Sequence, residues 1–125
     1  MKNELLHITL NQYTTLSGVT QDLNLSYQLF GKPLHTAPIV MVNHALTGNS
    51  DVSGENGWWK DLIGDGKAID TNNYTVLSFN IPGNGYDGFV IDNYKDFVAR
   101  DVANIFLLGL EVLKIDELYA LIGGS

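Results

Sequence analysis

The sequence contains no cysteine among its 125 residues. A disulfide framework and a zinc site built on thiolates are therefore excluded, and we expect no bound metal. Basic residues are also few: seven lysines and arginines face fourteen aspartates and glutamates, giving a net charge of -7, and Arg100 is the only arginine. A surface that follows nucleic-acid phosphates needs clustered positive charge, so no nucleic-acid partner is expected.

Long apolar runs are missing as well. The opening MKNELLHITL carries an acidic residue early and only a short apolar stretch, which fits neither a signal peptide nor a membrane span. Two N-x-S/T matches, at Asn24 and Asn73, have no secretory context. We therefore expect a cytoplasmic protein of one domain, without a membrane partner.

Five segments have the composition of strands. Residues 4–10 and 23–30 alternate apolar and polar side chains imperfectly, as half-buried strands do, and turn residues lie between them. They predict an antiparallel pair near a sheet edge. Residues 38–43, 74–80 and 118–124 are short apolar runs rich in β-branched or aromatic residues, which is typical of strands covered on both faces.

Helices are predicted between the buried strands. Apolar residues recur at helical spacing from Tyr94 to Leu113, with Asp92 or Asn93 as the cap, and a shorter helix is predicted from Trp58 to Ile63. Strands that alternate with helices indicate an α/β fold with a parallel sheet and right-handed crossovers.

The stretch NHALTGNS, residues 43–50, directly follows the first buried strand. Loops at the carboxyl ends of parallel strands line the ligand crevice of open α/β sheets, so this loop could supply a backbone donor to an oxyanion. The alternative is an ordinary connection in which His44 is a structural histidine. His44 is not favoured as a general base, because no acidic residue stands at a telling spacing from it.

The stretch GNGYDG, residues 83–88, has the letters of the dinucleotide-binding pattern G-x-G-x-x-G. That pattern must open a helix, whereas here Pro82 precedes it and the helical periodicity starts several residues later. We interpret it as a glycine-rich loop that could line a pocket.

The stretch IGGS, residues 122–125, ends the last predicted strand. It corresponds to the first half of a nucleophile elbow, G-x-S-x-G, in which a serine occupies a tight strand-to-helix turn. By itself Gly-Gly-Ser is equally typical of a loop or a tail. Its position after a series of buried strands favours the elbow.

Taken together, these stretches resemble the amino-terminal part of the homoserine O-acetyltransferase family, an acyltransferase branch of the α/β-hydrolase fold. The resemblance rests on NHALTGNSDVSG, on GWWKDLIGDGKAIDTNNYTVLSFN, on RDVANIF and on the final IGGS. From about residue 38 onward the match is nearly continuous.

The resemblance implies a fold and a reaction. The fold is the N-terminal half of an α/β-hydrolase, with an antiparallel edge pair leading into a mostly parallel sheet with crossover helices. Ser125 corresponds to the nucleophile, and Leu46 to the residue whose backbone N–H forms half of the oxyanion hole. The family transfers acetyl from acetyl-CoA, a co-substrate and not a bound cofactor, to the hydroxyl of L-homoserine in methionine biosynthesis.

The resemblance also implies what the 125 residues do not include. The catalytic aspartate, the catalytic histidine and the helical lid come later in the family's chains, so residues 1–125 would be one incomplete domain. We expect this chain alone to be inactive, and either to self-associate through its uncovered sheet edge or to be poorly stable. The loop at residues 82–94 is shorter than the family's, which leaves open a succinyl donor, a serine acceptor, or ester hydrolysis. A non-enzymatic α/β binding module is the remaining alternative.

Overall fold

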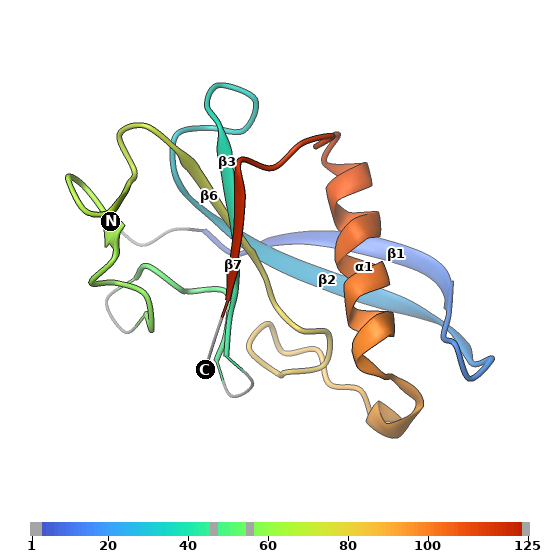
Figure 1. Cartoon of the computed structure of the whole chain (residues 1–125). Coiled ribbons are helices and arrows are strands. Elements are labelled where there is room, and N and C mark those ends of the chain that lie inside the picture. The colour runs from blue at the N-terminus through green and yellow to red at the C-terminus, as the bar shows by residue number, and fades with distance from the viewer. Residues whose placement is uncertain (1–3, 46–47, 55–56, 124–125) are drawn as a thin grey trace.

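The structure is a computed structural model of the chain and describes residues 4–45, 48–54 and 57–123. Its centre is a five-stranded sheet in the order β1-β2-β6-β3-β7 (Figure 1). The strands are β1 (Leu6–Thr14), β2 (Thr20–Gly31), β3 (Ile39–Asn43), β6 (Thr75–Phe79) and β7 (Ala120–Gly123). All five correspond to segments that the sequence predicted as strands.

Strand direction divides the sheet into two parts. β1 pairs antiparallel with β2, and β2 pairs antiparallel with β6. β3 then lies parallel to both β6 and β7. The predicted antiparallel edge pair and the parallel buried strands are thus confirmed. β1 runs beyond its predicted end at residue 10, because a register shift between Leu10 and Tyr13 lets the strand continue past Gln12, whose φ is 58°.

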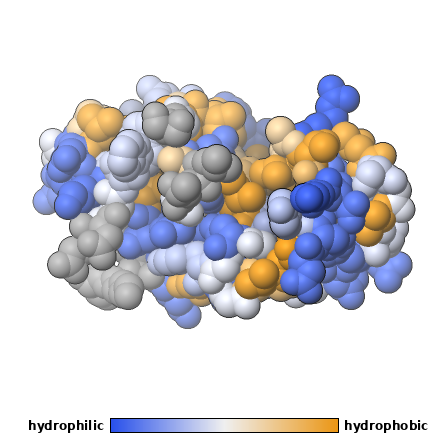
Figure 2. Space-filling view, turned by 90° about the horizontal axis from the view of Figure 1, so that it is seen from below, coloured by the Kyte–Doolittle hydropathy of each residue, from blue (hydrophilic) through white to orange (hydrophobic). Residues whose placement is uncertain are grey.

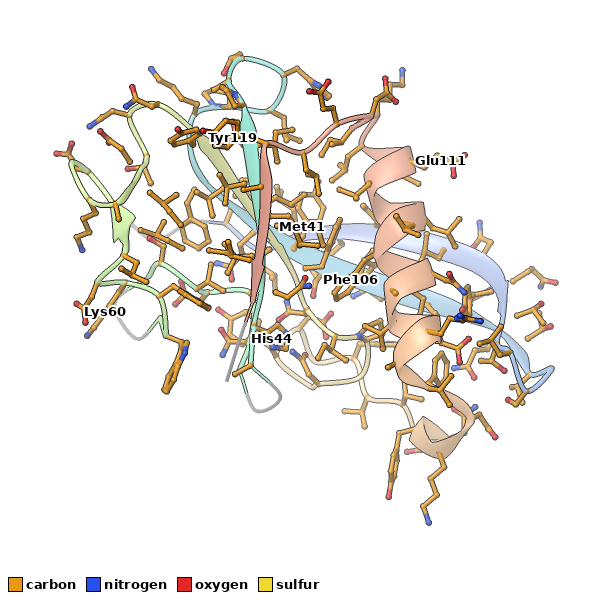
Figure 3. The ribbon with its side chains drawn as sticks, viewed as in Figure 1. Met41, His44, Lys60, Phe106, Glu111 and Tyr119 are labelled. Carbon is orange, nitrogen blue, oxygen red and sulfur yellow. The ribbon has the colours of Figure 1, made fainter. Side chains whose placement is uncertain are left out.

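One face of the sheet is covered by the helix α1 (Ala99–Val112). Successive side chains of a strand point to opposite faces of the sheet, so every second residue points toward α1. The helix contributes Ile105 and Phe106 to the core that it shares with the sheet. Met41 and Phe106 lie between the sheet and the helix, while Glu111 points to solvent (Figure 3). No helix among the described residues is long and apolar enough to cross a bilayer.

The other face is covered by the segment between β3 and β6. Val52 and Ile63 from this segment are buried against Val40, Val42 and Val76 of the sheet. The segment contains a second small sheet, in which β4 (Ile63–Gly64) pairs in parallel with β5 (Ile69–Asp70). Both faces of the central strands are therefore buried, as their continuous apolar composition predicted.

The predicted short helix from Trp58 to Ile63 is wrong. The described part of this segment forms turns and then the strand β4. Besides its local turn bonds, the segment is tied to the residues before it: the Trp59 N–H donates to the Val52 carbonyl at 2.9 Å, and the Ile63 carbonyl accepts the Ser53 hydroxyl at 2.9 Å. These cross-segment bonds, together with the burial of Ile63, outweigh a weak local helical preference.

The predicted start of the long helix is also wrong. A short 3₁₀ turn, η1 (Tyr94–Asp96), comes first, Phe97 is extended, and α1 begins only at Ala99. The reason lies at Asp101, whose Oδ2 accepts the Val98 N–H at 2.9 Å and whose Oδ1 accepts the Leu16 N–H at 3.0 Å. A carboxylate in the first turn suits the positive end of the helix dipole, so α1 starts where Asp101 can cap it.

Candidate active site

The candidate site lies at the edge of the sheet where the parallel strands end. β3 and β7 stay in register to their last residues, so Asn43 pairs with Gly123, and Asn80 directly follows β6. In Figure 1 these ends lie together below the sheet. The predicted nucleophile Ser125 and the predicted oxyanion residue Leu46 lie outside the described residues.

His44 follows β3 and is buried, with 8% of its surface exposed. Its Nε2 accepts the backbone N–H of Ile81 at 3.1 Å, so the ring proton is on Nδ1, which donates to the Ala45 carbonyl at 2.6 Å. Burial lowers the pKa of the imidazole below 6.5, and the bond to Ala45 opposes this only in part. His44 is thus a neutral structural histidine with both nitrogens engaged.

Ser50, at the other end of the same loop, is tied to the end of β6. Its backbone N–H donates to Asn80 Oδ1 at 2.7 Å, and its Oγ accepts Asn80 Nδ2 at 2.8 Å. Ser50 is 0% exposed and Asn80 1% exposed. The loop that begins at His44 is therefore anchored at both ends to two consecutive residues, Asn80 and Ile81.

The bonds of Ser50 and Asn80, which we call the anchor, extend to β2 through further buried side chains. Asn80 Nδ2 also donates to Ser26 Oγ at 2.8 Å, and the Ser50 hydroxyl donates to Gln28 Oε1 at 2.7 Å. Asn84 Nδ2 donates to Asn80 Oδ1 at 3.1 Å. The bonds among Ser26, Gln28, Ser50 and Asn80 join residues distant in sequence, and the bond from Asn84 fixes the start of the loop after β6. The polar cluster therefore holds these segments in one arrangement.

The end of β3 also carries a buried acceptor. Asn43 Oδ1 is buried and has no hydrogen-bond partner among the described residues. A Cβ added at Gly123 would lie 3.3 Å from the Asn43 Cβ, so a glycine suits this close approach of the two strands. A buried acceptor without a partner is costly, which makes it a candidate contact for a polar group entering the site.

The glycine-rich loop at residues 83–88 does not open a helix. It forms turns closed by a bridge between Asn84 and Val90, and α1 begins only at Ala99. Gly83 has a φ of 84°, and a Cβ there would lie 2.9 Å from the Ile91 side chain. The dinucleotide interpretation therefore fails on its structural context, because the loop does not open a helix and the described helices η1 and α1 begin only after it.

The other histidines lie elsewhere. His7 is on β1 at the edge of the sheet, where its Nδ1 is 3.2 Å from Asn24 Nδ2. His35 comes before β3, at its amino end, and its Nε2 is 3.0 Å from the Leu113 carbonyl oxygen. The described residues contain no group of three His, Asp or Glu side chains able to hold a metal ion.

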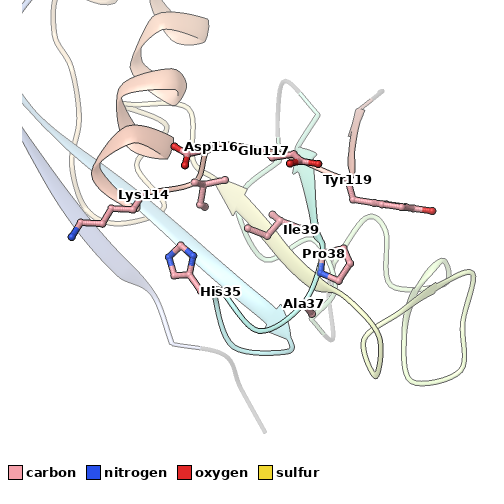
Figure 4. Close-up of a pocket in the computed structure, with 9 residues that line it drawn as sticks. His35, Ala37, Pro38, Ile39, Lys114, Asp116, Glu117 and Tyr119 are labelled. Carbon is pink, nitrogen blue, oxygen red and sulfur yellow. The ribbon is translucent and has the colours of Figure 1, made fainter.

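A cavity of about 480 Å³ lies at the opposite end of the sheet. Pro38 and Ile39, where β3 begins, line it together with Tyr119, which precedes β7 (Figure 4). The cavity is thus remote from the carboxyl ends of the strands. The view from the end where those strands finish shows hydrophilic and hydrophobic residues intermixed (Figure 2).

Sequence reasoning found the loop at residues 43–50 but missed Ser50, Asn80 and Gln28. Ser50 and Asn80 are the last letters of NHALTGNS and YTVLSFN, so polar residues at strand and loop ends were the available signal. Gln28 lies inside a strand, where a polar residue between apolar ones predicts a side chain that faces solvent. It is nevertheless 2% exposed, and its Oε1 accepts the hydroxyl of Ser50.

Comparison with known proteins agrees with this architecture. The sequence profile of the α/β-hydrolase fold matches residues 38–125. Homoserine O-acetyltransferase from Corynebacterium diphtheriae is 34% identical over 134 aligned positions, which cover 97% of this chain and 35% of the relative. The chain thus spans about a third of the length of this curated relative.

Two solved structures superpose on nearly the whole chain. Homoserine O-acetyltransferase from Staphylococcus aureus has a TM-score of 0.79 at 30% identity and covers 99% of this chain, which spans 39% of that protein. Esterase E22 has a TM-score of 0.79 at 28% identity, with coverages of 99% and 41%. The chain therefore belongs to the α/β-hydrolase fold family, where its relatives include homoserine O-acetyltransferases.

Proposed function

We propose that this chain forms the amino-terminal part of a serine-dependent acyltransferase that moves acetyl from acetyl-CoA to the hydroxyl of L-homoserine. The supporting observation is the register of β3 and β7, which pair as far as Asn43 and Gly123. The ends of β3 and β7 consequently lie side by side, and in this proposal the oxyanion loop and the nucleophile follow these two ends. An oxyanion donor and a nucleophile must be neighbours in this way.

In the proposed reaction, the Ser125 hydroxyl oxygen attacks the thioester carbonyl, and its proton goes to a general base. The tetrahedral oxyanion is stabilised by backbone N–H groups, including that of Leu46. Expulsion of the CoA thiolate leaves an acetyl ester on Ser125. The homoserine hydroxyl then attacks this ester and gives its proton to the base, and the base passes a proton to the departing Ser125 oxygen, which releases O-acetylhomoserine and restores the serine.

The chain alone is proposed to be inactive, because none of its histidines, all of which the structure describes, is placed to act as the base. Of its three histidines, His44 has both nitrogens engaged, His7 lies on β1, and His35 lies at the amino end of β3. A serine hydroxyl without a base is a weak nucleophile at neutral pH. The family's catalytic histidine and aspartate would be supplied by the longer parent protein.

The test uses that parent protein with acetyl-CoA and L-homoserine, and follows release of the CoA thiol. The expected result is thiol release that depends on homoserine and is abolished by Ser125→Ala. The control Ser17→Ala, in the β1–β2 turn, should keep full activity. Homoserine-dependent turnover that survives Ser125→Ala would contradict the proposed nucleophile.

Ester hydrolysis is a second candidate, favoured by the superposition on esterase E22. The two reactions differ in the acceptor, which is homoserine in one and water in the other. Chromatography of the same reaction mixture separates O-acetylhomoserine from acetate. Acetate formed at a rate independent of homoserine would support the hydrolase, and no turnover of either kind would support a binding module.

A further inference from the structure

The loop at residues 44–50 is held at both ends by neighbouring groups. At one end the Ile81 N–H donates to His44 Nε2 at 3.1 Å, and at the other the Ser50 N–H donates to Asn80 Oδ1 at 2.7 Å. We propose that Asn80 is a positioning residue for acyl transfer, which sets the direction of the backbone N–H groups in this loop. The inference rests on the proposed function, in which this loop supplies an oxyanion donor.

The carboxamide of Asn80 is itself fixed. Its Oδ1 must face the Ser50 N–H, because a backbone amide can only donate, so Nδ2 faces Ser26 Oγ and Ser50 Oγ, each at 2.8 Å. Its backbone N–H donates to the Ser26 carbonyl at 2.9 Å, which joins it to β2. With 1% of its surface exposed, Asn80 has no room to swing.

A fixed Asn80 matters because oxyanion donors act by being oriented before the reaction. A displacement of about 1 Å can cost roughly a hundredfold in rate. The two described parts of the loop are also linked to each other, because the Gly48 N–H donates to the Ala45 carbonyl at 2.8 Å. We therefore expect a shift of Ser50 to reach Gly48 and, through this bond, Ala45.

Any buried polar residue could lower activity simply by weakening the fold, so the test needs a matched control. Ser78 lies in β6 on the same face as Asn80, is 0% exposed, and donates its hydroxyl to the Val42 carbonyl at 2.7 Å. This bond joins β6 to β3 and involves neither His44 nor Ser50. Ser78 stands opposite Gln28 in the β2–β6 register, so Ser78→Ala removes a buried hydrogen bond next to the anchor while leaving the bonds of Asn80 in place.

The experiment compares Asn80→Ala with Ser78→Ala in two ways. In the parent protein, Asn80→Ala should lower kcat by about 10- to 100-fold with little change in the KM for homoserine, because only transition-state stabilisation is lost. Ser78→Ala should leave both constants nearly unchanged. In the 125-residue chain, amide exchange at Ser50 should accelerate in Asn80→Ala beyond the acceleration of core amides, and in Ser78→Ala it should follow them.

Three outcomes would overturn the inference. They are equal losses of kcat in the two variants, a raised KM with unchanged kcat in Asn80→Ala, and unchanged exchange at Ser50. A parent protein with no acyl transfer would remove the proposed function, and with it the catalytic part of this inference. The exchange measurement distinguishes that case, because it reports the anchoring of the loop by Asn80 without any turnover.

Discussion

Gly109 of α1 is where the helix approaches the sheet, and its replacement by alanine is the sharpest test of the packing. A Cβ at this position would lie 2.7 Å from Leu25 Cδ2 and 2.9 Å from both Cε1 and Cζ of Phe79. Carbon atoms prefer a separation of about 3.5–4.0 Å, so each contact is too short. The Phe79 ring cannot yield easily, because it is fully buried and stacks on Phe106 with centroids 5.2 Å apart.

Two effects oppose each other in Gly109→Ala. Alanine is favoured over glycine in a helix by about 1 kcal/mol, whereas overpacking a filled core costs about 1–3 kcal/mol. We expect the clash to dominate and the free energy of unfolding to fall by about 1 kcal/mol, with a melting temperature lower by about 4 °C. Urea unfolding followed by far-UV circular dichroism measures the difference, provided that the m-value stays constant.

Ala103, which is exposed on the same helix, provides the matched control. Ala103→Gly reports the intrinsic preference alone and should destabilise the chain by about 1 kcal/mol. If Gly109→Ala instead stabilised the chain by a similar amount, mirroring the control, the close packing of α1 on Phe79 would be refuted.

Three further predictions concern other parts of the fold. Tyr13→Phe removes a buried 2.7 Å hydrogen bond from the phenol to Asp101, and it should lower the free energy of unfolding in urea by about 1–2 kcal/mol. Burial and this bond raise the pKa of Tyr13 to about 12, and an unchanged urea midpoint would contradict the importance of the bond. Because burial lowers the pKa of His44, its contribution to stability should be complete above about pH 6.5 and lost as the pH falls toward its folded-state pKa; His44→Gln should flatten that dependence, and equal slopes in both proteins would refute it. β7 exposes Leu121 at 58% beside an edge that no described strand covers, so the 125-residue chain should self-associate in light scattering, whereas a monodisperse monomer would count against it.

The strands were predictable because their signals are local. The run PIVMV is apolar because both of its faces are covered. The alternation in LNLSYQLF correctly predicted a strand but not its burial, since Ser26 and Gln28 on its polar side are buried as well. The helix start was not predictable, because Tyr94 continues the apolar spacing while the cap depends on Asp101 meeting Leu16 from a distant hairpin. The helix predicted from Trp58 was wrong for the same reason, because the segment is held by hydrogen bonds to Val52 and Ser53, which lie in an earlier turn.

The residues of the candidate site were likewise predictable only in part. By itself, the sequence determined the α/β class, the segments that end at the site, and the resemblance that makes Ser125 and Leu46 the predicted nucleophile and oxyanion residue. Only the tertiary structure decided that His44 is a neutral structural residue and that Asn80 anchors the loop at Ser50. The physical reason is that the composition of a strand depends on which of its faces are buried, and this pattern is visible in consecutive residues of the sequence. Hydrogen-bond partners instead depend on sheet order, and here β2 and β6 become neighbours although more than forty residues separate them.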